Sequence, residues 1–346
     1  MGLLLCEWGI TMSDQASWRS SIISCRAFSE MVPMGTVLRP VRHTVLAVFL
    51  AITGLVIPAA PVNATEFLVN TITALDQQVP SVAALTGGGF VVAWEDLSLT
   101  APDTSFNAVR AQRYDANGVA QGSDFLVNTI TSSSQFQPSV AALNDGGFVI
   151  AYGDNSQLTL DTTQAAILAT RFDAVGVRQG SEFLVNTTTA STQLTPSVAA
   201  LSDGGFVIAW RDDSLSPQGA VVRAQRYDAS GGPQGSEFLV STATAASQVE
   251  PSVAGLTGGG FIIAWRDDNG DGNGKTVRAQ RYDANGLVQG GKFQVNTTIT
   301  NDQYQPSVAA LSNGNFVIAW RDDSLAAPDT DSSAVRARIY NAGGTA

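Results

Sequence analysis

Two polar residues recur at fixed positions along this sequence, and their types could form a binding site. A glutamine precedes a proline by three residues five times, at Gln77, Gln135, Gln193, Gln248 and Gln303. An aspartate follows a Trp or Tyr by two residues five times, at Asp96, Asp154, Asp212, Asp267 and Asp322. Amides and carboxylates beside aromatic rings suit sugars, because they exchange hydrogen bonds with hydroxyl groups while the ring packs on the sugar. The pattern therefore indicates a repeated ligand-binding surface.

The same residues also have a purely structural interpretation. An aspartate after a strand caps a turn through its own backbone, a repeated glutamine ties one repeat to the next, and buried aromatic residues are common in β proteins. The sequence leaves both interpretations open. Replacing Asp212 and Asp267 with asparagine distinguishes them, because a loss of stability with unchanged ligand binding favours the structural one.

Two glutamates break the repeat pattern and are the candidates for acid–base chemistry. Glu95 stands where later repeats carry Arg211, Arg266 and Arg321, and Glu250 lies directly before a proline. Glycoside hydrolysis uses a pair of carboxyl groups, which usually lie in different environments. Both glutamates occupy variable, surface-type positions. The sequence therefore favours a non-catalytic protein and keeps a glycoside hydrolase as an alternative.

One acidic loop resembles the start of a calcium-binding loop. It places oxygen ligands at alternate positions, Asp267, Asn269 and Asp271, and a glycine follows. The match is partial, because the twelfth position is Arg278 instead of a glutamate that would bind the ion through both oxygens. Calcium is the one cofactor that the sequence suggests.

The residues that nucleophilic and zinc chemistry most often use are confined to the first part of the chain. Cys6, Cys25 and His43 are the only cysteines and the only histidine among the 346 residues. Without residues 1–64, the chain has no thiol, imidazole or disulfide. A Ser-His-Asp triad and a Cys/His zinc site are then excluded.

An apolar segment near the N-terminus predicts export. Two arginines precede the apolar run 44–57, and small residues lead to Ala64, after which we expect a signal peptidase to cleave. A membrane anchor is the alternative, but the run is shorter than the about 20 residues of a spanning helix. Residues 1–30 fit no export signal, which suggests that translation starts at Met31 or Met34. We therefore expect a secreted or cell-surface protein.

The net charge restricts the partners. It is −11 for the whole chain, and removing residues 1–64 makes it one unit more negative. An acidic surface repels nucleic-acid phosphates and anionic membranes. We therefore expect no nucleic-acid partner and no membrane insertion after signal cleavage, whereas neutral ligands and cations remain suitable.

Five repeats supply the elements that position these residues. The segment P-S-V-A-A/G-L recurs with its prolines 55 to 58 residues apart, as the difference of their numbers gives, at Pro80, Pro138, Pro196, Pro251 and Pro306. Each repeat holds four β-type runs between turn residues. Residues 90–94 are apolar on both faces, as in a strand covered on both sides, and residues 109–114 alternate in character. Because no stretch shows a helical period, residues 65–346 are predicted to form an all-β, five-bladed β-propeller of four-stranded blades.

The phase of the repeats predicts how the propeller closes. The exported chain begins with a fourth-strand motif at 66–70 and ends just after a third-strand motif at 335–340. The N-terminal strand would then pair into the last blade and leave no exposed edge. A row of separate β-sandwich modules is the rival, but a repeat of this length is small for an independent core.

The repeats resemble a family of tandem repeats in large exported bacterial proteins. The resemblance rests on FVVAW at residue 90, VRAQRYDANG at residue 109 and EFLVNT at residue 66, and it covers about residues 66–345. In that family the repeats often accompany calcium-binding or adhesin modules. This chain lacks the glycine-rich nonapeptide calcium repeats, so the resemblance does not by itself imply a calcium role.

These observations favour a secreted, non-catalytic binding module. We expect several similar blades to recognise a carbohydrate or another extracellular surface ligand at several weak sites, which gain strength through avidity. A structural or adhesive repeat domain stabilised by calcium is an alternative. The sequence does not indicate an oligomeric state.

Overall fold

The protein is built entirely of β-strands and turns in the part that the structure describes. The computed structural model describes residues 66–346 except 158–163, 216, 243–245, 269 and 271. The described residues belong to one compact unit, Pro61–Ala346, and the predicted leader, 1–64, lies outside them. Within this part of the chain, no helix has the length and apolarity that crossing a bilayer requires.

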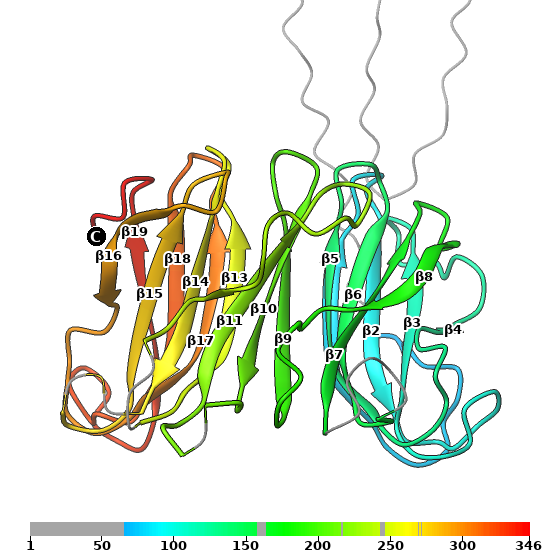
Figure 1. The fold of residues 1–346 in the computed structure, drawn as a ribbon, viewed down its shortest axis with the longest axis horizontal. Helices are drawn as coiled ribbons and strands as arrows, with labels where there is room; N and C mark the ends of the chain where they lie inside the picture. The colour runs from blue at the N-terminus through cyan, green and yellow to red at the C-terminus, as the bar shows by residue number, and fades with distance from the viewer. Residues whose placement is uncertain (1–65, 158–163, 216, 243–245, 269, 271) are drawn as a thin grey trace, which may run out of the picture. The chain divides into compact units, whose positions relative to one another are not determined.

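The strands form five antiparallel sheets, one for each repeat (Figure 1). The blades are, in chain order, β1 (Gln77–Ala84), β2 (Phe90–Asp96), β3 (Ala108–Tyr114) and β4 (Phe125–Leu126); β5 (Gln135–Ala142), β6 (Phe148–Asp154), β7 (Ala166–Phe172) and β8 (Arg178–Leu184); β9 (Gln193–Ala200), β10 (Phe206–Asp212), β11 (Val221–Tyr227) and β12 (Phe238–Leu239); β13 (Gln248–Gly255), β14 (Phe261–Asp267), β15 (Thr276–Tyr282) and β16 (Val288–Gln294); and β17 (Gln303–Ala310), β18 (Phe316–Asp322) and β19 (Ala334–Tyr340). The predicted all-β, five-bladed propeller is confirmed.

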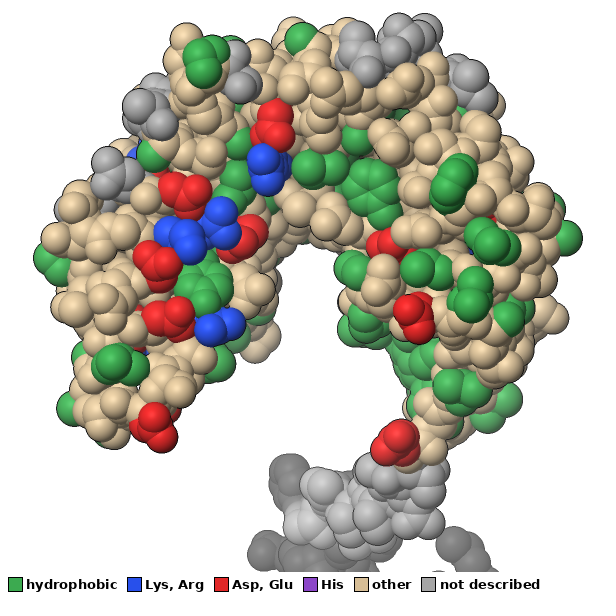
Figure 2. Space-filling view, turned by 90° about the horizontal axis from the view of Figure 1, so that it is seen from below, with side chains coloured by type: hydrophobic (Ala, Val, Ile, Leu, Met, Phe, Trp, Pro, Cys, Tyr) green, Lys and Arg blue, Asp and Glu red, His purple; other side chains and the backbone are tan. Residues whose placement is uncertain are grey.

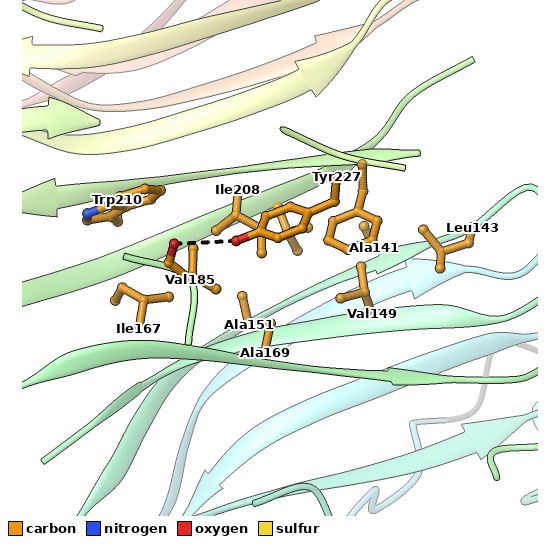
Figure 3. Close-up of a cluster of buried hydrophobic side chains, with 12 residues drawn as sticks. Ala141, Leu143, Val149, Ala151, Ile167, Ala169, Val185, Ile208, Trp210 and Tyr227 are labelled. Carbon is orange, nitrogen blue, oxygen red and sulfur yellow. Dashed lines mark hydrogen bonds between the residues drawn. The ribbon is translucent and has the colours of Figure 1, made fainter. Parts of the chain in front are cut away.

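The hydrophobic core lies between neighbouring blades. Figure 3 shows one such cluster, in which side chains of the second and third blades meet. Trp210 is fully buried there, and the Tyr227 hydroxyl donates a hydrogen bond to the Val185 carbonyl at 3.4 Å. Phe206 stacks on Tyr227 with ring centroids 4.9 Å apart. Each blade therefore buries its apolar face only against its neighbours, as repeat proteins do.

The first strand of every blade carries an irregularity directly before its proline. The pairing register with the second strand shifts there, for example between Phe136 and Ser139. The residue before each proline adopts a left-handed conformation, and these residues are Val79, Gln137, Thr195, Glu250 and Gln305. Left-handed backbone is costly for residues other than glycine. The bulge turns the side chains beside it away from the regular strand pattern.

The predicted closure by the N-terminal strand is not confirmed. Figure 2 shows the blades in an arc around a central hollow, with an opening between its ends. The last sheet contains three strands, and residues 66–70 form none. Instead, Phe67 packs on the first blade, 5.2 Å from the Tyr114 ring, as Phe125 packs on Phe172 in the second. The segment thus keeps its contact with the first blade without reaching β19.

Candidate functional site

The repeated glutamines and aspartates meet in pairs inside the blades. The glutamine begins the first strand and the aspartate ends the second, so the two lie opposite each other, as Gln135 and Asp154 do. The Gln135 amide donates to Asp154 at 2.8 Å, and Gln193 donates to Asp212 at 3.2 Å. The corresponding distances are 3.4 Å for Gln77 with Asp96 and 3.2 Å for Gln303 with Asp322. In the fourth blade, Gln248 and Asp267 lie opposite each other in the same register.

Further hydrogen bonds give these glutamine–aspartate pairs a structural role. The Gln135 carbonyl oxygen accepts a hydrogen bond from Asn128, at the end of the preceding repeat, at 3.0 Å. The Asp212 carboxylate accepts from the backbone N–H of Ser214 at 2.9 Å and from its hydroxyl at 2.7 Å. Gln135, Gln193 and Asp212 have no exposed surface. This geometry is the one that the structural interpretation predicts, a capped turn tied to the preceding repeat.

An arginine completes the network in four of the five blades, and its partners were not evident from the sequence. Arg110 lies between the second-strand Asp96, at 2.8 Å, and the fourth-strand-motif acid Asp124, at 3.2 Å. Arg223 bridges Asp212 and Glu237 in the same way. The Arg110 side chain is only 6% exposed, whereas those of Arg223, Arg278 and Arg336 are 18–28% exposed. All four form an ion pair with the aspartate of their own blade.

The second blade lacks this arginine. Leu168 occupies the position, and Tyr152 replaces tryptophan and donates its hydroxyl to Glu182 at 2.5 Å. Burial raises the pKa of the Asp154 carboxyl, against hydrogen bonds from Ser156 and Gln135 that lower it. Asp154 therefore differs chemically from its counterparts.

The predicted calcium loop is described only in part. Asn269 and Asp271 lie outside the described residues. Asp267 forms an ion pair with Arg278 at 3.2 Å, and Arg278 also donates to the Gly270 carbonyl. Among the described residues, no group of three or more Asp, Glu, His or Cys side chains is placed to hold a metal ion. A calcium ion would compete with the guanidinium of Arg278 for Asp267.

The side chains that differ most between blades lie around the bulges, and we call this surface the inner rim. It comprises the two residues before the repeated proline of each blade and the residue between the Trp or Tyr of the second strand and the repeated aspartate. Glu95 accepts hydrogen bonds from Asn107 at 2.5 Å and from the backbone N–H of Gln137 in the next blade at 3.3 Å. Glu250 accepts from the N–H of Gln305 in the next blade at 2.8 Å and pairs with Arg266. The two glutamates therefore both link neighbouring blades, on the first and fourth blades respectively. The expectation of a surface position is wrong for Glu95, which is only 4% exposed because these contacts enclose it.

The inner rim of the fifth blade presents an aromatic ring among charges. The Tyr304 ring lies 5.3 Å from the Lys275 ammonium and 4.8 Å from the Arg321 guanidinium, and its hydroxyl donates to Asp323 at 2.9 Å. Lys275 also pairs with Asp302 at 2.9 Å. Their hydrogen bond raises the pKa of Lys275 and lowers that of Asp302, so both stay charged near neutral pH. Figure 2 shows such opposite charges gathered around apolar side chains on one arm of the arc.

Comparisons with known proteins support the architecture alone. No family model matches the sequence, and a comparison with curated proteins finds no relative. A protein of unknown function from Dyadobacter fermentans is 15% identical over 78% of this chain and 80% of its own, with a TM-score of 0.55. The GH93 α-L-arabinofuranosidase of Fusarium graminearum, solved with arabinobiose, is 13% identical over 78% and 82%, with a TM-score of 0.51. An endo-arabinase of Bacteroides thetaiotaomicron is 13% identical over 79% and 96%, with a TM-score of 0.48.

Proposed function

We propose that this protein is an exported, non-catalytic binding protein whose ligand is an extracellular carbohydrate, bound at the inner rim. The observation that carries the proposal is the half-buried Tyr304 ring with cations beside it and carboxylates within reach. An aromatic ring packs on the apolar face of a sugar, and charged side chains around it exchange hydrogen bonds with the hydroxyl groups. The fold likeness to an α-L-arabinofuranosidase is compatible with a carbohydrate partner but does not establish one.

The proposed site is asymmetric, which modifies the expectation of several similar sites. The repeated glutamine and aspartate side chains are engaged inside the blades, whereas the rim carries a different residue after the glutamine in each blade, as Phe136 and Tyr304 show. A ligand that contacts several blades would therefore meet a different surface on each. Multivalent binding then requires a ligand long enough to follow the rim.

A glycoside hydrolase is the second candidate, because both candidate glutamates lie on the rim. Hydrolysis needs two carboxyl groups about 5–9.5 Å apart across one glycosidic bond. Glu95 and Glu250 belong to the first and fourth blades, and each accepts hydrogen bonds that join its blade to the next. These contacts favour a structural role for both carboxylates over a catalytic one.

Export, an adhesive role and calcium binding remain proposals. Signal cleavage after Ala64 would place the protein outside the cell or on its surface. An adhesive repeat domain stabilised by calcium is compatible with the acidic loop that begins at Asp267. Calcium is proposed to bind there by displacing Arg278 from that carboxylate.

A glycan array tests the proposal. The purified full chain is applied once with calcium and once with a chelator. Binding to a series of related glycans without release of products supports the non-catalytic module, and binding lost in chelator supports calcium at the Asp267 loop. An absence of binding in both conditions removes the carbohydrate proposal, and products that disappear in Glu95→Gln and Glu250→Gln variants favour the hydrolase.

A further inference from the structure

At the end of the blades opposite the second-to-third-strand loops, an arginine from each of several blades reaches to the next blade. Arg113 donates from Nη1 to the Val175 carbonyl at 2.8 Å, and Arg281 does so to the Gly343 carbonyl at 2.5 Å. Arg171 makes the same contact with the Ser230 carbonyl at 2.7 Å. These contacts fix one end of each guanidinium and leave Nη2 available for another partner.

In the second and third blades, which we call the middle blades, Nη2 pairs with an aspartate of the turn between the first and second strands. Arg171 Nη2 pairs with Asp145 at 3.5 Å, and Arg226 Nη2 pairs with Asp203 at 3.4 Å. The partner is therefore supplied by the turn between the first and second strands of the same blade.

The first and fourth blades have a glycine where this aspartate stands. Gly87 and Gly258 are the equivalent residues. Across the described part of the chain, no acidic side chain forms an ion pair with Arg113 or Arg281. The sequence thus removes the carboxylate in two blades and keeps the arginine.

A cavity lies at each of these two positions. One has a volume of about 280 Å³ and is lined by Gly87, Arg113, Tyr114, Asp115 and Gln121, with residues of the second blade. The other has a volume of about 360 Å³ and is lined by their fourth-blade counterparts, which are Gly258, Arg281, Tyr282, Asp283 and Gln289, with residues of the fifth. Each cavity thus lies where the middle blades carry the aspartate. The glycine leaves this space open, and the arginine beside it forms no ion pair among the described residues.

We infer that these two cavities are binding sites for a sugar acid, such as a uronate, whose carboxylate pairs with the arginine. A guanidinium binds a carboxylate through parallel N–H donors, and the ligand would replace the aspartate of the middle blades. Asp283 also lines the fourth-blade cavity, where one of its oxygens accepts the backbone N–H groups of Asn285 and Leu287. This second charge disfavours a bare anion and favours a ligand that also carries hydroxyl donors.

The middle blades show which substitution should block the two cavities. Replacing Gly87 and Gly258 together with aspartate recreates the arrangement of the middle blades. A side chain fits, because a Cβ atom at either glycine has no neighbour within 4 Å and neither residue has a left-handed backbone. The Gly87→Asn/Gly258→Asn variant is the matched control, because it adds a side chain of the same size without a negative charge.

Calorimetric titration of the full chain with sodium D-glucuronate tests the inference. We expect two sites per chain, weaker binding of D-glucose and of acetate, and at least a tenfold loss of affinity in the double aspartate variant. The double asparagine variant should lose less. Unchanged binding in the aspartate variant, equal losses in both variants, or equal binding of glucose or acetate would each overturn the inference.

The two proposals fail separately. The cavities share no residue with the inner rim, so Tyr304→Ala should leave the glucuronate titration unchanged. If Tyr304→Ala removes glucuronate binding and the double aspartate variant keeps it, the sugar acid binds at the inner rim instead, and the assignment to the cavities is wrong.

Discussion

The aspartate at the end of the second strand has different partners in different blades, which gives it different acidity. Burial opposes ionisation of Asp322, but hydrogen bonds from Ser324 and Arg336 leave the pKa of its carboxyl below 3.8. In Asp154, whose blade carries Leu168 at the position of the arginine, burial raises the pKa above 3.8. The pKa values of these two aspartates therefore shift in opposite directions.

These directions predict opposite effects on stability as the pH changes. A carboxyl with a raised pKa keeps its proton longer in the folded chain, so the stability that it contributes falls as the pH rises above 3.8. A lowered pKa has the opposite effect, because stability is then lost as the pH falls through the folded-state value. In the wild type, Asp154 makes the free energy of unfolding fall as the pH rises, and Asp322 makes it rise. Each contribution should be absent from the corresponding Asp154→Asn or Asp322→Asn variant. Urea denaturation between pH 2 and 7 covers both windows, below 3.8 for Asp322 and above it for Asp154. The same slope change in the two variants would contradict the assignment.

The paired aspartates should also matter more for stability than for ligand binding. Asp212→Asn takes the negative charge from a fully buried group that accepts hydrogen bonds from Ser214 and pairs with Arg223. We expect the free energy of unfolding to fall by about 1–3 kcal/mol, because buried polar groups lose a partner. Glycan affinity, measured where the variant is folded, should not change. A variant of unchanged stability that no longer binds would restore the original assignment of this aspartate to the ligand site.

At the scale of the elements, the bulge before each proline places the inner rim at the cost of local strain. Val79 and Thr195 are the least suitable of these residues for a left-handed backbone, because both are β-branched. The buried hydroxyl of Thr195 also has no hydrogen-bond partner among the described residues. A glycine in its place would relieve the strain without changing the fold.

Thr195→Gly should therefore raise the free energy of unfolding relative to Thr195→Ala. We expect a difference of about 1 kcal/mol, because strain of this kind costs about 1–3 kcal/mol and glycine loses part of that in entropy. The alanine variant removes the hydroxyl and keeps the Cβ atom, which isolates the backbone effect. Chemical denaturation measures both, and an alanine variant as stable as the glycine variant would show that the bulge is not strained.

At the scale of the whole molecule, the two ends of the arc expose surfaces that are buried at every internal interface. Val82 on the first blade is 66% exposed, whereas its counterpart Val140 is 7% exposed. Val335 on the last blade is 83% exposed, whereas its counterpart Val109 has no exposed surface. The exposed surfaces of the first and last blades therefore match the two sides of the interface that joins neighbouring blades elsewhere. Pairing of these two surfaces would close the ring, and this closure stays a prediction.

An engineered disulfide tests this closure. In the first blade Arg110 lies opposite Leu126, so the same register would place Arg336 opposite Leu68. In a chain with Cys6 and Cys25 changed to serine, Leu68→Cys and Arg336→Cys should form a disulfide within one monomer if the ring closes. Non-reducing electrophoresis and mass spectrometry detect it. Disulfide-linked dimers would show that the ends pair between chains, and free thiols would show that the arc stays open.

The repeats were sufficient to predict the blades, because each apolar block such as 90–94 occupies the same buried strand in every sheet. The interior role of Gln135 and Asp154 was recognised only as one of two interpretations, since a polar residue in a sequence does not reveal its partner. The cavities beside Arg113 and Arg281 could not be predicted, because they depend on the distance between a turn and the neighbouring blade. The difference between Gly87 and Asp145 was visible in the sequence, but its meaning needed that geometry.

The inner rim carries the central claim, so the most direct measurement is the affinity of its tyrosine variants for the best glycan from the array. Tyr304→Ala removes the ring. Tyr304→Phe keeps the ring and loses only the hydroxyl group, which donates a hydrogen bond to Asp323. The account predicts that calorimetric titration shows a loss of about tenfold or more for alanine and a small loss for phenylalanine, because the packing of the ring on the sugar supplies the binding energy. Equal affinity of the wild type and Tyr304→Ala would contradict the account and place the carbohydrate elsewhere.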